Sequence, residues 1–213
     1  MTAPSRSPRT LAVAGGTVLL VALGLFALML AGRPSGNSAA APAAPVEKSA
    51  DVGFARDMSV HHQQAVEMSF IVRDRTSDEE VRRLAYDIIN TQANQRGMML
   101  GWLEAWGRPK SSSAPPMAWM GHTVIPRGDG SLMPGMATDA ELDALRKTKD
   151  RDAEVLYLKL MTEHHRAGAD MAQAAADVAG TGEIENLAAG MVRGQQSEIG
   201  LMADMLKERG ATA

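Results

Sequence analysis

Apolar residues after position 50 recur every three to four residues in four long stretches, bounded by helix start and stop signals. These stretches cover about 51–73, 78–106, 150–178 and 183–209. The spacing matches the 3.6-residue turn of an α-helix, and no stretch alternates apolar and polar residues as a half-buried strand does. The sequences Ser77–Glu80 and Thr138–Glu141 are capping boxes, which start the second long helix and a short extra helix. The pattern predicts an all-α fold.

The long helices form two similar pairs. Residues 54–107 align without a gap with residues 157–210, and 13 of the 54 positions are identical. Unrelated sequences of average composition would share roughly three. Because one helical hairpin is too short to bury its own apolar face, we expect two repeated hairpins to close one core as a four-helix bundle with a pseudo-twofold axis.

Four of the five histidines lie at matching positions of the two repeats. The motifs are Met58-x-x-His61-His62 followed by Met68, and Met161-x-x-His164-His165 followed by Met171. On a helical wheel the first set spans an arc of about 120°, so the histidines lie on or beside the apolar stripe. The pattern indicates a metal site. Core packing preserved by duplication is the alternative interpretation.

The residue types favour a soft ion. The chain has 15 methionines and no cysteine, so thiolate ligands and disulfides are excluded. Imidazole and thioether together favour copper, especially Cu(I), with silver as a second candidate, whereas zinc seldom takes methionine. Adjacent histidines diverge by about 100° on a helix, so the two motifs can share one ion or hold separate ions.

The long loop 108–137 repeats the same chemistry outside the helices. It carries further methionines and the fifth histidine, namely Met117, Met120, His122, Met133 and Met136. Soft donors in a loop can wrap around an ion, so we predict that they help to capture copper. Packing of these methionines on the bundle is the alternative.

Polar residues on the second and fourth helices also correspond between the repeats. Gln92 matches Gln195, and Gln95 matches Glu198, each pair one helical turn from the other. Such side chains can orient metal-binding histidines through hydrogen bonds, although they are more often solvated or pair with other buried polar groups.

The N-terminal region predicts a membrane anchor. Residues 1–9 carry two arginines, and residues 10–32 form an uncharged, mostly apolar run long enough to span a bilayer. Residues 33–50 are rich in Ala, Pro, Ser and Gly and predict a flexible linker to a domain at 51–210. The positive-inside rule places 1–9 in the cytoplasm and the domain outside, anchored by an uncleaved signal or secreted after cleavage.

The charge pattern argues against nucleic acid as a partner. The net charge is −3, and no basic stripe or aromatic platform occurs. The predicted partners are therefore a metal ion and, through the N-terminal helix, a membrane.

The doubled Met-x-x-His-His motif and the Met133-Pro-Gly-Met136 segment resemble the domain of unknown function 305 family, including its CopM-like group. The resemblance covers about residues 50–210. It implies a ferritin-like four-helix bundle outside the cytoplasm, and some members are associated with copper binding and copper tolerance. It also implies that the methionines and histidines of these motifs are the ligands.

Three functions are consistent with these features. The first is copper capture for buffering or tolerance, without catalysis, because no nucleophile–base pair or phosphate loop is evident. The second is a copper oxidase, and the third is a structural or partner-binding bundle without metal. A di-iron enzyme would need Glu-x-x-His on facing helices, but Arg166 occupies the third position after Glu163.

Overall fold

The computed structural model describes residues 43–121 and 124–212, and all regular structure within them is helical. The four long helices are α2 (Ala50–Arg73), α3 (Glu79–Ala105), α5 (Asp150–Val178) and α6 (Gly182–Glu208). Two short elements lie between α3 and α5, the 3-10 helix η1 (Ala118–Met120) and α4 (Asp139–Lys147). The all-α prediction is confirmed, and the predicted limits of the long helices agree with the observed ones to within one residue.

The predicted anchor at 10–32 lies outside the described residues, as do most of the predicted linker and His122. Of the helices in the described ranges, none combines the length and apolar character needed to cross a bilayer. Residues Ala44–Ala213 form one compact unit.

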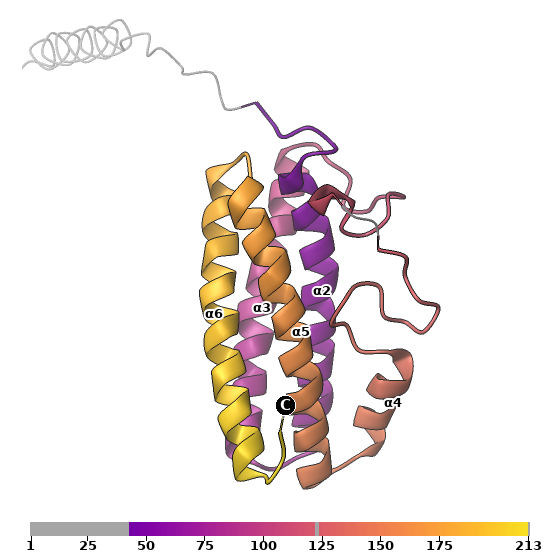
Figure 1. Ribbon diagram of the computed structural model, residues 1–213, viewed down its shortest axis with the longest axis vertical. Coiled ribbons are helices and arrows are strands. Elements are labelled where there is room, and N and C mark those ends of the chain that lie inside the picture. Colours follow the sequence, from indigo (N-terminus) through magenta and orange to yellow (C-terminus); the bar gives the residue numbers. More distant parts are fainter. Residues whose placement is uncertain (1–42, 122–123, 213) are drawn as a thin grey trace, which may run out of the picture. The chain divides into compact units, whose positions relative to one another are not determined.

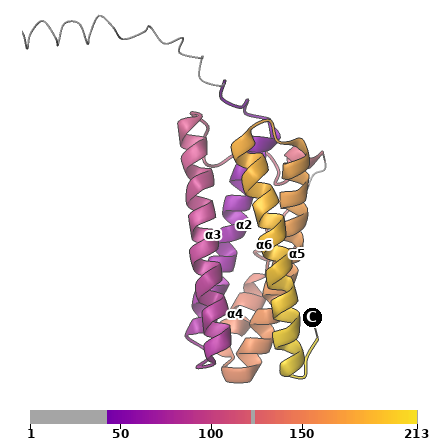
Figure 2. The same cartoon turned by 90° about the vertical axis from the view of Figure 1, so that its left-hand side faces the viewer.

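The long helices run side by side along one axis, with α2 and α6 pointing one way and α3 and α5 the other (Figures 1 and 2). Helices α2 and α3 form one hairpin, α5 and α6 form the other, and α2 packs against α5 between the hairpins. We call the end where α2 begins and η1 packs the upper end, and the end beside α4 the lower end. The segment between η1 and α4 runs along the outside of the bundle from upper to lower end (Figure 1).

Local capping explains where α3 and α4 begin. Thr138 and Glu141 form the predicted capping box of α4. The capping box predicted at Ser77 is wrong, because α3 is capped one residue later by Asp78, whose carboxylate accepts from the Val81 amide at 2.9 Å. The Thr76 hydroxyl accepts from the Asp78 amide at 2.9 Å, which holds the turn in the register that favours Asp78.

Buried apolar side chains form two clusters along the bundle. The lower cluster contains Met68, Met161, Met202 and Met205 together with residues such as Val72, Ile88, Tyr157 and Leu206. The upper cluster contains Met58, Met99, Met117, Met133, Met171 and Met191 together with residues such as Phe54, Leu103 and Ile184. Each His-His pair lies between one methionine of the upper cluster and one of the lower cluster. The histidines therefore form a polar layer between the two clusters.

Candidate metal centre

The four motif histidines meet in the middle of the bundle. His61, His62 and His165 are fully buried, and His164 is 1 % exposed. The rings of His61 and His164 lie 3.7 Å apart between centroids at an angle of 33°, and His164 lies 6.2 Å from His165. The contact arises because antiparallel α2 and α5 bring corresponding positions of the two motifs together.

Hydrogen bonds orient three of the rings. His62 Nε2 lies 2.8 Å from Gln95 Oε1, and His165 Nε2 lies 2.7 Å from a carboxylate oxygen of Glu198. His164 Nε2 lies 3.0 Å from the His61 carbonyl oxygen. Amide oxygens, carboxylates and carbonyls only accept hydrogen bonds, so in each case Nε2 is the donor and Nδ1 carries a lone pair.

Several of these ring nitrogens lack partners. Nδ1 of His62, Nδ1 of His165 and both ring nitrogens of His61 are buried without a hydrogen-bond partner among the described residues. Buried polar atoms in native proteins are nearly always satisfied, so such a group requires an explanation. A metal ion that accepts one lone pair each from His61, His62 and His165 would explain three of the four nitrogens, and the other His61 nitrogen carries the ring proton.

The protonation states suit metal binding. Burial lowers the pKa of His61 to about 3, helped by the nearby charges of His62 and His165, while the neighbouring Pro134 carbonyl opposes the shift. Burial also lowers the pKa of His62 to about 4 and that of His164 well below its usual value. These three imidazoles are therefore neutral at pH 7, and their lone pairs are available without loss of a proton.

The motif methionines flank the histidines from both sides. Met58 and Met171 belong to the upper cluster, whereas Met68 and Met161 belong to the lower one. All four are at most 1 % exposed. The thioethers thus lie above and below the histidine layer and do not form one group.

The Met133–Met136 segment crosses this layer on the outside of α2 and α5. Gln64 clamps the segment through two hydrogen bonds to the Ala137 backbone, at 2.8 Å and 2.7 Å. Gly135 has φ +75°, and a Cβ there would lie 2.7 Å from the Glu163 carbonyl oxygen, beside His164. Only glycine fits this approach. Met133 is buried in the upper cluster and Met136 packs partly buried against it.

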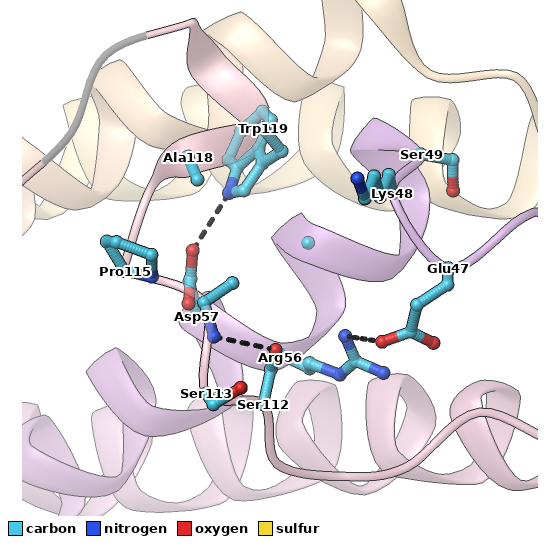
Figure 3. A pocket seen from close by; sticks show the side chains of 12 residues that line it. Glu47, Lys48, Ser49, Arg56, Asp57, Ser112, Ser113, Pro115, Ala118 and Trp119 are labelled. Carbon is cyan, nitrogen blue, oxygen red and sulfur yellow. Dashed lines mark hydrogen bonds and ion pairs between the residues drawn. The ribbon is translucent and has the colours of Figure 1, made fainter.

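The second methionine segment of the loop covers the upper end. Met117 is 5 % exposed and has φ +61°, which is unusual for a bulky residue. Asp57 holds this turn, since its carboxylate accepts from the Met117 amide at 2.7 Å and from Trp119 Nε1 at 2.9 Å. Figure 3 shows the bond from Trp119. Trp119 and Asp57 line a cavity of about 600 Å³ at the start of α2. Burial raises the Asp57 pKa, while these two hydrogen bonds oppose the shift.

The predicted ligands therefore divide into groups. Met58, Met171, Met117 and Met133 share the upper cluster, with Met120 and Met136 packed against it, whereas Met68 and Met161 lie in the lower cluster. Within the described parts of the chain, no three or more His, Asp or Glu side chains are placed to hold one ion together. An ion at this layer would therefore need thioether donors besides imidazole.

The four polar residues that the sequence indicated on α3 and α6 form two pairs with different contacts. Gln95 and Glu198 orient His62 and His165 as the sequence suggested. Gln92 and Gln195 are buried, and the side-chain oxygen of each lacks a partner among the described residues. Gly168 provides the space for Gln195, because a Cβ at this position would lie 2.5 Å from Gln195 Oε1.

Sequence reasoning missed Gln64 and Asp57. Neither belongs to the repeated motif, because the aligned residues of the second copy are Ala167 and Leu160. The only signal was a polar residue where the other repeat carries an apolar one.

Proteins of one family share this architecture. Residues 51–206 match the family model described as Domain of unknown function (DUF305). A DUF305 protein from Streptomyces coelicolor that has been predicted to be secreted is 62% identical, with TM-score 0.73 over 78% of this chain and 98% of that one. A DUF305 fragment from Deinococcus radiodurans is 30% identical, with TM-score 0.64 over 77% and 99%.

A third solved structure, CopM in its Cu(II)-bound form, is 25% identical, with TM-score 0.60 over 75% of this chain and 97% of that one. CopM has also been solved in Cu(I)-bound and Ag-bound forms. None of the curated proteins matches the chain. The match over residues 51–206 shows that this chain belongs to the DUF305 family.

Proposed function

We propose that this protein captures copper, with silver as a second ion, at the histidine layer and the methionines of the upper cluster, and that it buffers the ion outside the cytoplasm. The observation that carries the proposal is the set of buried lone pairs on His61, His62 and His165 that have no partner in the described structure. Copper-bound and silver-bound forms of a fold relative, CopM, support it.

The donor set explains the choice of ion. Cu(I) and Ag(I) accept few ligands and favour sulfur and imidazole nitrogen, which are the donors gathered here. A hard ion such as Mg²⁺ or Ca²⁺ would instead require several oxygen ligands. Neutral imidazoles and thioethers add no charge, so a monovalent ion can enter the core at a smaller electrostatic cost than a divalent one.

The proposal includes the ligands His61, His62, His164 and His165 with Met58 and Met171, and assigns Met117, Met120, Met133, Met136 and His122 to capture by the loop. Met68 and Met161 complete the predicted set on the lower side. It also includes a ferritin-like class for the bundle, a duplicated origin of its hairpins, and an N-terminal membrane anchor. No turnover is part of this function.

The test is a titration of the purified chain, kept in detergent throughout, with Cu(I) and with Ag(I). We expect affinity tighter than micromolar, and a loss of binding when His61, His62, His164 and His165 are all replaced by alanine. Binding weaker than micromolar, or binding that survives the four replacements, would overturn the proposal. Oxygen consumption with Cu(I) that requires the same histidines would instead support an oxidase.

A further inference from the structure

The two hairpins differ by one charge beside the histidine layer. His62 Nε2 donates to Gln95 Oε1 at 2.8 Å, and His165 Nε2 donates to Glu198 at 2.7 Å. Residues 95 and 198 are equivalent in the alignment of the two hairpins. The two imidazoles therefore share the same tautomer and the same unpartnered Nδ1, but a neutral amide supports one and a carboxylate supports the other.

The carboxylate is placed where its charge acts on the interior. His165 is fully buried, and the Glu198 side chain is 24 % exposed. In the ranges 43–121 and 124–212, Glu198 accepts a hydrogen bond from His165 and forms no salt bridge with a lysine or arginine. Because partly buried charges are screened less than exposed ones, the negative charge reaches an ion bound on the opposite side of the His165 ring.

We propose that Glu198 is a positioning residue that makes the α5–α6 half of the centre the stronger one for Cu(II). The inference rests on the proposed function. A carboxylate hydrogen-bonded to a metal-binding histidine fixes the ring and increases its strength as a ligand. Its attraction for an ion grows with the ion's charge, so Cu(II) gains about twice as much as Cu(I) or Ag(I). The His62 half, supported by neutral Gln95, lacks this preference.

The chain offers a matched set of variants. Glu198→Gln keeps an acceptor for His165 Nε2 but removes the charge, and Gln95→Glu adds a charge at the equivalent position. The double exchange Gln95→Glu/Glu198→Gln moves the carboxylate to the other hairpin at constant net charge. Each variant is purified as the full chain in detergent and titrated with Cu(II) and with Ag(I), which serves as a redox-inert monovalent probe.

We expect Glu198→Gln to weaken Cu(II) binding by about 10–100-fold and Ag(I) binding by less than tenfold. The reduction potential of the bound copper should then rise, by about 59 mV for each factor of ten between the losses for the two oxidation states. Gln95→Glu alone should strengthen Cu(II) binding. It tests the inference even if Glu198→Gln fails to fold, which thermal unfolding would reveal.

Histidine replacements in both backgrounds decide the question. In the native chain, His165→Ala should cost more Cu(II) affinity than His62→Ala, and in the exchanged chain the order should reverse. Equal losses of Cu(II) and Ag(I) on Glu198→Gln, or an order that does not reverse, would overturn the inference while copper capture stands. Failure of the unchanged chain to bind either ion would overturn the proposed function and this inference with it.

Discussion

The upper and lower ends of the bundle carry the same motif methionines in different surroundings. Met58 and Met171 lie in the upper cluster, where loop residues Met117 and Met133 join them. At the lower end Met68 and Met161 lie among residues of the four long helices and α4, and of the loop residues that the structure describes, Ala137 alone joins this cluster. The repeated motif thus supplies thioethers on both sides of the histidine layer, but the loop adds further thioethers on one side only.

Because the repeated motif is the same at both ends, the loop should determine which end admits the proposed ion. At the lower end, an ion would have to pass between closely packed α-helical side chains, which a native core resists. At the upper end, the covering segment is an irregular loop held by a few side-chain hydrogen bonds, and such segments open at low free-energy cost.

The histidine layer that separates the two ends should make the fold sensitive to acid. His61 and His62 have pKa values of about 3 and about 4 in the folded protein, below the ordinary value of 6.5. Between the folded-state and ordinary pKa values the unfolded chain binds more protons than the folded one. The stabilisation from the neutral histidines is therefore fully present above about pH 6.5 and is lost as the pH falls. From pH 7 to pH 4.5 we expect these two groups to cost roughly 5 kcal/mol of stability, measured by urea unfolding without metal.

The control for the acid effect is His61→Leu. This variant removes one titrating group and the unpartnered nitrogens of His61, so the pH dependence should become shallower while the stability at pH 7 changes little. An unchanged slope would show that carboxylates, and not the histidine layer, cause the loss.

Paired replacements compare the two ends directly. Met58→Leu/Met171→Leu removes two upper thioethers, and Met68→Leu/Met161→Leu removes two lower ones. Leucine conserves volume, so each pair should cost less than about 3 kcal/mol in stability. We expect the upper pair to weaken Ag(I) binding about 100-fold, or about 2.7 kcal/mol, and the lower pair to weaken it less than fivefold. Equal effects in calorimetric titration would remove the contrast between the ends.

Gly135→Ala should detach the loop where it crosses the layer. The added Cβ would lie 2.7 Å from the Glu163 carbonyl oxygen, and φ is +75°. Strain of this kind costs about 1–2 kcal/mol, and we expect Ag(I) affinity to fall about tenfold because Met133 and Met136 are displaced. Gly128→Ala is the matched control, because a Cβ there meets nothing within 4 Å. Equal losses in the two variants would show that loop docking plays no part.

The sequence predicted the helices and the motif histidines but not the contacts of the loop. Periodicity located the helices to within one residue, because their apolar stripes and caps are local signals. Identity between the repeats located the histidines that meet in the core. The loop contacts could not be predicted, because Asp57 and Gln64 lie where the repeats differ and bond to residues 60 to 73 positions away. Pairing over such distances depends on how the loop closes, for which no periodic pattern exists.

The smallest effect should come from Asp57, which holds the cover of the upper end. Asp57→Ala removes two hydrogen bonds, to the Met117 amide and the Trp119 side chain. Burial already raises the pKa of this carboxyl, so the charged group bears a desolvation cost that offsets part of their value. The net loss of stability should therefore be only about 1 kcal/mol.

Hydrogen exchange separates this local role from a global one. In Asp57→Ala the Met117 amide should lose protection while amides of α2 keep theirs, because the strained turn at φ +61° then opens independently of the bundle. Asp57→Asn keeps one acceptor oxygen, so its Met117 amide should show protection between that of the native chain and that of Asp57→Ala. The second hairpin has Leu160 at the aligned position and so lacks this carboxylate. Faster Ag(I) uptake by Asp57→Ala at nearly unchanged affinity would identify the upper end as the route into the histidine layer. Unchanged uptake with full loss of Met117 protection would assign the route elsewhere.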